Sequence, residues 1–192
     1  MTLPRTTYSR DEAVKRALAQ HTNVPDTCQL VTRTWVGAPS AGDYDGDGSA
    51  DAEDGWRSEP ETRKHPGDRK PPAGTPVSYL GGSNDNGHRA LSLGPVGPDG
   101  RYMIRSTDAA GRGRVGTVPL DWPEREWGLT YVGWSETCDG SLIPGGNPRP
   151  EPLTPEQRAE VIKRAANAAR RAGHPGWAAR LRAWAKRIGR RA

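Results

Sequence analysis

The stretch Asn86-Gly87-His88-Arg89-Ala90 is the one around which we expect the chain to fold. It follows a short β-like run, Pro76 to Leu80, and a polar turn, and it opens a second run of apolar residues, His88 to Leu93. A histidine at the start of a strand, just after a glycine turn, projects from the sheet edge with one ring nitrogen free. A general base paired with a distant nucleophile needs that geometry, although a lone loop histidine is more often simply solvated.

Two helices are predicted upstream of this stretch. Ser9 and Glu12 fit a capping box that begins a helix extending to about Gln20. Thr27 is a suitable N-cap for a second helix over Cys28 to Val36. The core-facing residues of that helix are expected to be Leu30, Val31, Thr34 and Trp35.

A series of short strands separated by turns is predicted next. The expected strands are Pro76–Leu80, His88–Leu93, Arg101–Ser106, Gly113–Pro119 and Leu129–Ser135. Trp122 to Trp127 reads as a short helical connector, and residues 55–74 as a long polar loop. Two helices followed by a run of antiparallel strands predict an α+β domain.

Length and composition favour one compact domain with an appendage. The 192 residues are only 33% hydrophobic, with no Phe and seven Trp, so tryptophan is expected to fill much of the core. No apolar run is long enough to cross a bilayer, and residues 1–10 lack the apolar segment of a secretory signal. The two cysteines, Cys28 and Cys138, are therefore expected to be reduced thiols, although they could pair.

Charge divides the chain unevenly. Residues 151–192 carry 11 Lys or Arg and 3 Asp or Glu, whereas the preceding 150 residues carry 17 and 20. We expect a main domain over residues 1–137, a Gly/Pro linker over 138–153 and a basic helical hairpin over 154–192. The hairpin could hold anionic wall polymers or a membrane surface, or its apolar stripe could dock its helices on each other or on the main domain. Nucleic acid is a weaker alternative, because no base-reading motif accompanies the basic residues.

The segment from Asp43 to Asp54 has the spacing of a twelve-residue calcium loop. Carboxylates fall at positions one, three, five, nine and twelve, and Gly48 falls at six, where the loop turns sharply. Position twelve is an Asp and not the longer Glu, and position eight is Ala50, which favours a single loop over an EF-hand pair. A structural Ca²⁺ is predicted here, with an acidic turn as the alternative. The candidate ligands are Asp43, Asp45, Asp47, the Ser49 carbonyl, Asp51 and Asp54.

Cys28 falls in the first turn of its predicted helix. There the helix dipole and the unpaired N–H groups favour a thiolate and are expected to lower the thiol pKa, although most free cysteines are simply small buried side chains. A cysteine at a helix start and His88 at a strand start suit a thiol hydrolase, in which a third polar group orients the imidazole. Asp108 is the first candidate for that third group, and Arg105 and Asn86 are weaker ones.

Over residues 10–135 the chain resembles the papain-like peptidoglycan hydrolases of the NlpC and CHAP type. The resemblance rests on T-C-Q-L-V-T-R around Cys28, on G-H-R-A around His88, and on the order Cys, His, polar residue. The acidic segment also looks like one found in cell-wall hydrolases of phages that infect actinobacteria. Arg89 departs from the pattern, because typical members have a smaller aliphatic residue after the histidine.

This resemblance implies a cysteine amidase or endopeptidase that cleaves amide bonds in peptidoglycan. Cys28 would attack the carbonyl, His88 would accept and return the proton, Asp108 would orient His88, and the Cys28 N–H would help to hold the oxyanion. Such an enzyme is made in the host cytoplasm and acts at the bacterial wall after release or as part of a virion. The alternative is a non-catalytic virion or wall-binding protein that keeps the fold and the calcium site.

Overall fold

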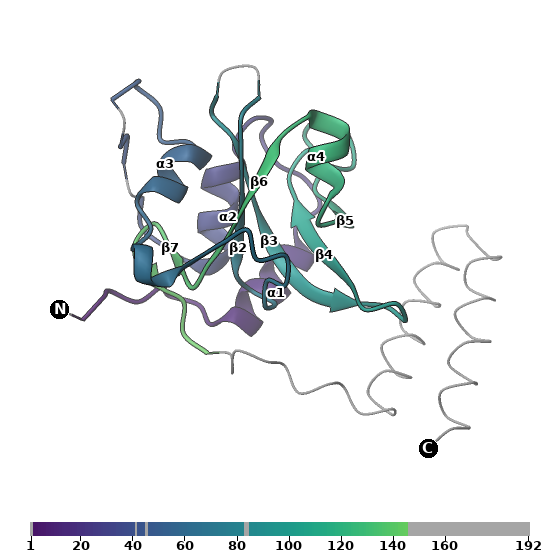
Figure 1. Cartoon of the computed structure of the whole chain (residues 1–192), viewed down its shortest axis with the longest axis horizontal. Coiled ribbons are helices and arrows are strands. Elements are labelled where there is room, and N and C mark those ends of the chain that lie inside the picture. The colour runs from purple at the N-terminus through teal and green to yellow at the C-terminus, as the bar shows by residue number, and fades with distance from the viewer. Residues whose placement is uncertain (1, 41, 45, 83–84, 146–192) are drawn as a thin grey trace. The chain divides into compact units, whose positions relative to one another are not determined.

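A six-stranded antiparallel sheet organises the residues that the computed structural model describes, namely 2–40, 42–44, 46–82 and 85–145 (Figure 1). The order of the strands across the sheet is β1-β6-β2-β3-β4-β5. The strands are β1 (Lys64–Pro66), β2 (Pro76–Leu80), β3 (His88–Val96), β4 (Arg101–Ser106), β5 (Gly116–Pro119) and β6 (Thr130–Ser135). A separate hairpin, β7 (Thr137–Cys138) and β8 (Ser141–Leu142), follows the sheet. The α+β class expected from the sequence is confirmed.

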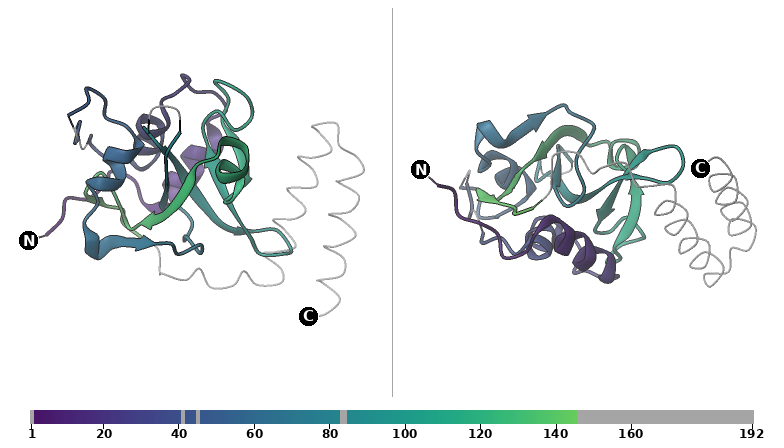
Figure 2. Two further views of the ribbon diagram at one scale, coloured as in Figure 1. Left: turned by 45° about the horizontal axis from the view of Figure 1, so that its top comes forward. Right: turned by 90° about the horizontal axis from the view of Figure 1, so that it is seen from below.

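Helices α1 (Arg10–Ala19) and α2 (Cys28–Val36) pack on each other and on β3, on one side of the sheet (Figure 2). The short helix α3 (Ala52–Arg57) lies against β2 and β3, and α4 (Trp122–Trp127) lies against β6. A single 3-10 turn, η1 (Glu61–Arg63), precedes β1. The amino ends of α2 and β3 are therefore held by the packing of a helix on the central part of the sheet.

Successive side chains of β3 point into two different hydrophobic cores. Leu91 lies in the core on the helical side, with Ala13, Ala17, Val31, Trp35, Val36, Val115, Cys138 and Ile143. Its neighbour Ala90 lies in the second core, with Val77, Tyr79, Ile104, Leu120, Leu129, Tyr131 and Trp134. Because successive strand residues point to opposite faces, His88 shares the face of Ala90, and Arg89 shares the face of Leu91.

The two long helices match their predicted positions, but α2 presents a different face to the core. Ser9 and Glu12 form the expected capping box of α1. In α2, Leu30 is 48% exposed and Thr34 is also exposed, whereas Thr32 is fully buried. The prediction of Leu30 and Thr34 as core residues is wrong because polar side chains of α2 turn inward to make hydrogen bonds. The Thr27 hydroxyl does not cap the helix either; it donates to the Val24 carbonyl at 2.6 Å.

The main domain extends beyond residue 137. Cys138 and Ile143 are in the helical-side core, and Asp139 is buried in an ion pair, so residues 138–143 are core and not linker. Helix α3, η1 and β1 occupy part of the predicted loop over 55–74. Residues 146–153 of the predicted linker and the predicted hairpin over 154–192 lie outside the described residues. No helix in the described ranges has the length and apolarity needed to span a membrane.

Candidate active site

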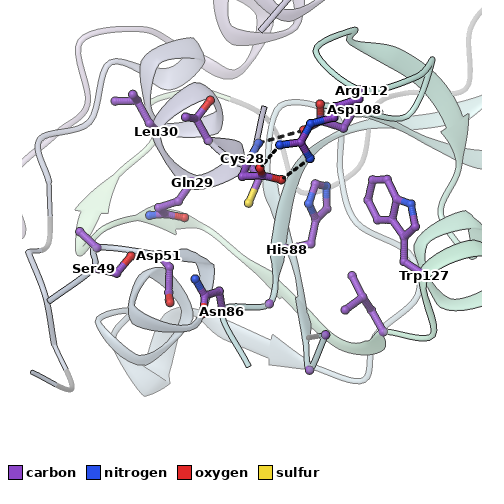
Figure 3. A pocket seen from close by; sticks show the side chains of 17 residues that line it. Cys28, Gln29, Leu30, Ser49, Asp51, Asn86, His88, Asp108, Arg112 and Trp127 are labelled. Carbon is purple, nitrogen blue, oxygen red and sulfur yellow. Dashed lines mark hydrogen bonds and ion pairs between the residues drawn. The ribbon is translucent and has the colours of Figure 1, made fainter. Parts of the chain in front are cut away.

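Cys28 and His88, the first residues of α2 and β3, line one cavity of about 750 Å³ (Figure 3). The Cys28 thiol interacts with the backbone N–H of Arg89, which places the sulfur beside the start of β3. Gly87 makes the turn into that strand with a φ of 66°, and a Cβ there would come within 2.5 Å of the Tyr79 carbonyl oxygen. Only glycine satisfies both conditions, so the turn fixes the place of His88.

His88 is held on both sides by its neighbours. Its Nε2 lies 2.9 Å from Ser106 Oγ, at the end of β4, and its ring meets the edge of Trp127 at 4.9 Å between centroids. The Ser106 hydroxyl donates to the Thr107 carbonyl at 3.1 Å, so its oxygen accepts from the imidazole Nε2–H. The neutral tautomer therefore carries its proton on Nε2 and leaves Nδ1 as the basic nitrogen.

Burial favours the uncharged forms of both groups. It lowers the pKa of His88 to about 4, and the Asp108 charge only partly opposes that shift. Burial also raises the pKa of the Cys28 thiol to about 11, against the backbone N–H groups of Arg89 and Gln29, while the charges of Asp51 and Asp108 raise it further. The lowered Cys28 pKa expected from the helix start is wrong, because desolvation outweighs the N–H groups. The resting pair is a thiol and a neutral imidazole.

Asp108 lines the same cavity but directs its carboxylate elsewhere. Its oxygens accept from the Asn23 side chain at 3.2 Å and from the backbone N–H groups of Asp26 and Gly113. Within the described residues, the hydrogen-bonding place beside His88 is occupied by Ser106 and not by Asp108. Asp108 thus ties the connector before α2 to the turn that follows β4, and acts on His88 through its charge.

The two weaker candidates for the third group are also accounted for. Arg105 points to the helical side, where it donates to the backbone carbonyls of Ala17 at 3.0 Å and of Gln20 at 2.6 Å. Asn86 lines the cavity, and its backbone carbonyl accepts from the N–H of Glu53 at 3.2 Å. Arg105 therefore stabilises α1, whereas Asn86 is placed to meet a ligand in the cavity.

The acidic loop borders the cavity through Ser49, Ala50 and Asp51. Its carboxylates bind the loop's own backbone: Asp43 accepts from the N–H groups of Gly46 and Gly48, and Asp54 accepts from that of Tyr44 at 2.9 Å. Asp51 caps α3. In the described ranges, which omit Asp45, no group of three or more His, Cys, Asp or Glu is placed to hold a metal. Calcium binding stays a prediction of the sequence pattern.

Sequence reasoning missed two residues that contact His88. Leu91 of β3 lies opposite Arg105 of β4. Because side chains alternate along both strands, Ser106 lies on the same face of the sheet as Ala90 and His88. A strand alignment of β3 with β4 would have found it. Trp127 is brought to the imidazole by α4, which no local pattern linked to the stretch around His88.

Comparisons with known proteins give no relative: no family model, no curated protein and no solved structure matches the chain.

Proposed function

We propose that the chain is a cysteine amidase or endopeptidase that cleaves amide bonds in peptidoglycan. The observation that carries the proposal is that Cys28 and His88 line one cavity, while Ser106 lies behind His88 at hydrogen-bond distance, so that a nucleophile, a base and an orienting group follow one another. The resemblance of the motifs around Cys28 and His88 to papain-like hydrolases of the NlpC and CHAP type supplies the substrate class. An α+β fold with a helix-start cysteine on an antiparallel sheet is consistent with that type.

In the proposed reaction, His88 Nδ1 takes the thiol proton as Cys28 Sγ bonds to the amide carbonyl carbon. The resulting oxyanion lies near the amino end of α2, where Val31 is the first residue to donate within the helix, to Thr27 at 2.9 Å. The N–H of Cys28 precedes it and is the donor that we propose for the oxyanion, whereas the N–H of Gln29 interacts with the Cys28 thiol. Ser106 keeps Nε2 protonated and the ring in place.

The tetrahedral intermediate then collapses. The carbon–nitrogen bond breaks, His88 returns its proton to the leaving amine, and a thioester joins the substrate acyl group to Cys28. Water next attacks the thioester and gives its proton to Nδ1, which passes it to the departing sulfur. The products are an amine and a carboxylic acid, and the thiol and neutral imidazole are restored.

The test is hydrolysis of purified cell walls by the wild type and three variants. Cys28→Ala and His88→Gln are expected to lose about 10³-fold or more in rate, because each removes one half of the reacting pair. Asp99→Ala is the control, since Asp99 is an exposed residue in the turn before β4 and is not among the residues that line the cavity. If Cys28→Ala still releases fragments at a near wild-type rate, the proposal fails. Wall attachment without fragment release by the wild type would favour the non-catalytic wall-binding alternative.

A further inference from the structure

A fully buried charge cluster lies behind the cavity. Arg89, which has no exposed surface, makes ion pairs with Glu59 and with Asp139, the latter at 3.0 Å. Glu59 also accepts from the backbone N–H groups of Asp139 and Gly140 at 3.0 and 3.3 Å. The cluster therefore joins the start of β3 to the segment after α3 and to the turn between β7 and β8.

The same cluster includes the residue that follows the nucleophile. Gln29 is 5% exposed, its Nε2 donates to Asp139 Oδ1 at 2.6 Å, and its Oε1 accepts weakly from Arg89 at 3.5 Å. One turn further along α2, the Thr32 hydroxyl donates to the Arg89 carbonyl at 3.2 Å. Two consecutive turns of α2 are thus bound to one residue of β3.

The cluster constrains the positions of Cys28 and His88, because it contains the residue that follows each of them in the sequence. Gln29 follows Cys28, and Arg89 follows His88, so both reacting residues have a neighbour in the same cluster. A side chain in a rigid element is positioned by the packing and hydrogen bonds behind it, and a shift of about 1 Å at a reacting atom can cost about 100-fold in rate. The arginine is the residue type suited to this place, because its planar fork meets two carboxylates at once.

We propose that Arg89 and Gln29 are positioning residues that hold the Cys28 thiol against the start of β3. The role rests on the proposed hydrolase function for its effect on rate, but the placement of the thiol can be measured without any substrate. Arg89, which departs from the pattern of the hydrolases that the chain resembles, then has a function of its own in the site and does not favour the non-catalytic alternative.

Helix α3 offers a variant that disturbs the cluster without removing any of its members. A Cβ at Gly55 would overlap the Arg89 guanidinium and would lie 2.5 Å from Gln29 Nε2. Alanine is a better helix former than glycine by about 1 kcal/mol, so Gly55→Ala should favour α3 locally. Any loss in the variant must then come from displacement of the two side chains, which are buried and cannot move into water.

The experiment measures the pH dependence of Cys28 alkylation by iodoacetamide, followed by mass spectrometry of the Cys28 peptide. In Gln29→Ala and Gly55→Ala, water that enters the disturbed cluster relieves part of the burial, so the alkylation midpoint should fall by about one pH unit. The kcat for wall fragments should fall about 10-fold or more, with KM within about twofold. Arg89→Lys should behave in the same way, because one ammonium cannot bridge both carboxylates.

Arg105→Lys is the matched control. Arg105 is another buried arginine on the helical side of the sheet, but it donates to backbone carbonyls at the end of α1 and not to the cluster. Its replacement should lower the melting temperature and leave the Cys28 alkylation profile unchanged. If folded Gln29→Ala and Gly55→Ala both retain the wild-type profile, the positioning role is wrong. A wild type without hydrolase activity but with a cluster-dependent profile would refute the proposed function and leave the positioning role standing.

Discussion

The cavity around Cys28 and the acidic loop from Asp43 to Asp54 border each other, yet they use their polar groups in opposite ways. At the cavity, residues far apart in the sequence contact one another: the Cys28 thiol interacts with the backbone N–H of Arg89, and the imidazole of His88 contacts the Ser106 hydroxyl behind it. In the loop, carboxylates such as Asp43 bind backbone N–H groups a few residues away. Long-range contacts build the first region, whereas local turn chemistry builds the second.

The contrast shows what each region requires from the rest of the fold. A carboxylate that accepts from nearby N–H groups needs only its own loop, because such turns form between residues close in sequence. The Cys28–His88 pair instead depends on the packing of α2 on β3 and on the buried cluster behind them. The cavity should therefore respond to changes far from it, and the loop mainly to changes within it.

The largest expected effect concerns the cavity: burial of His88 should make the stability of the protein fall at acid pH. The pKa of His88 is about 4 in the folded state, below an ordinary value near 6.5, so its contribution to stability is present above pH 6.5 and is lost as the pH falls through 4. A difference of this size corresponds to about 3 kcal/mol of unfolding free energy. Urea unfolding at pH 7 and pH 4 should show a smaller loss for His88→Gln than for the wild type.

The control for this measurement is His21→Gln, because His21 is exposed. It should follow the wild-type dependence on pH. Equal losses of stability in all three proteins would show that His88 is not held neutral by burial, and the thiol and neutral imidazole pair described for the cavity would have to be revised.

A second expected effect distinguishes the role of Ser106 from that of Asp108. Ser106→Ala removes the acceptor of Nε2–H and should lower kcat about 10-fold and not more, because Cys28 and His88 both remain. Asp108→Ala removes an acceptor of several hydrogen bonds and should cost about 1–3 kcal/mol of stability. Its kcat should fall less than that of Cys28→Ala. Fragment release and thermal unfolding of both variants provide the comparison. A larger kcat loss in Asp108→Ala than in Ser106→Ala would return the orienting role to Asp108.

How far the sequence predicts each region follows from the same physics. The capping box and the alternation are local, so they placed the starts of α1 and β3 correctly. The start of α2 was also placed correctly at Cys28, although the Thr27 hydroxyl does not cap that helix. The hydrogen-bond partner of His88 depends on strand register, and the sequence analysis, which proposed Asp108 with Arg105 and Asn86 as weaker candidates, did not consider Ser106. The burial of Gln29 and Thr32 was hidden because their partners, Asp139 and the Arg89 carbonyl, are distant in sequence. The predicted lowering of the Cys28 pKa was wrong for the same reason, because desolvation depends on all the residues that surround the thiol.

The smallest expected effect concerns calcium in the loop. The prediction is that millimolar Ca²⁺ raises the unfolding free energy by about 1 kcal/mol, as expected for a single loop with a Kd of about 10⁻⁴–10⁻³ M. Chelator should lower the melting temperature of the wild type, and a double variant, Asp45→Ala with Asp47→Ala, should remove that sensitivity. Asp99→Ala is the control, because Asp99 is an exposed carboxylate in the turn before β4, outside the loop.

Two results would distinguish a cation site from a loop that is held by its own backbone. Titration calorimetry should show heat for the wild type and for Asp99→Ala, and none for the double variant. Because Asp43 accepts hydrogen bonds from the N–H groups of Gly46 and Gly48, these bonds support the turn, and we expect the protein to stay folded in chelator. The absence of heat for the wild type at millimolar calcium would mean that the carboxylates serve only the turn and the cap of α3. The loop would then border the cavity through Asp51 as a wall and not as a metal centre.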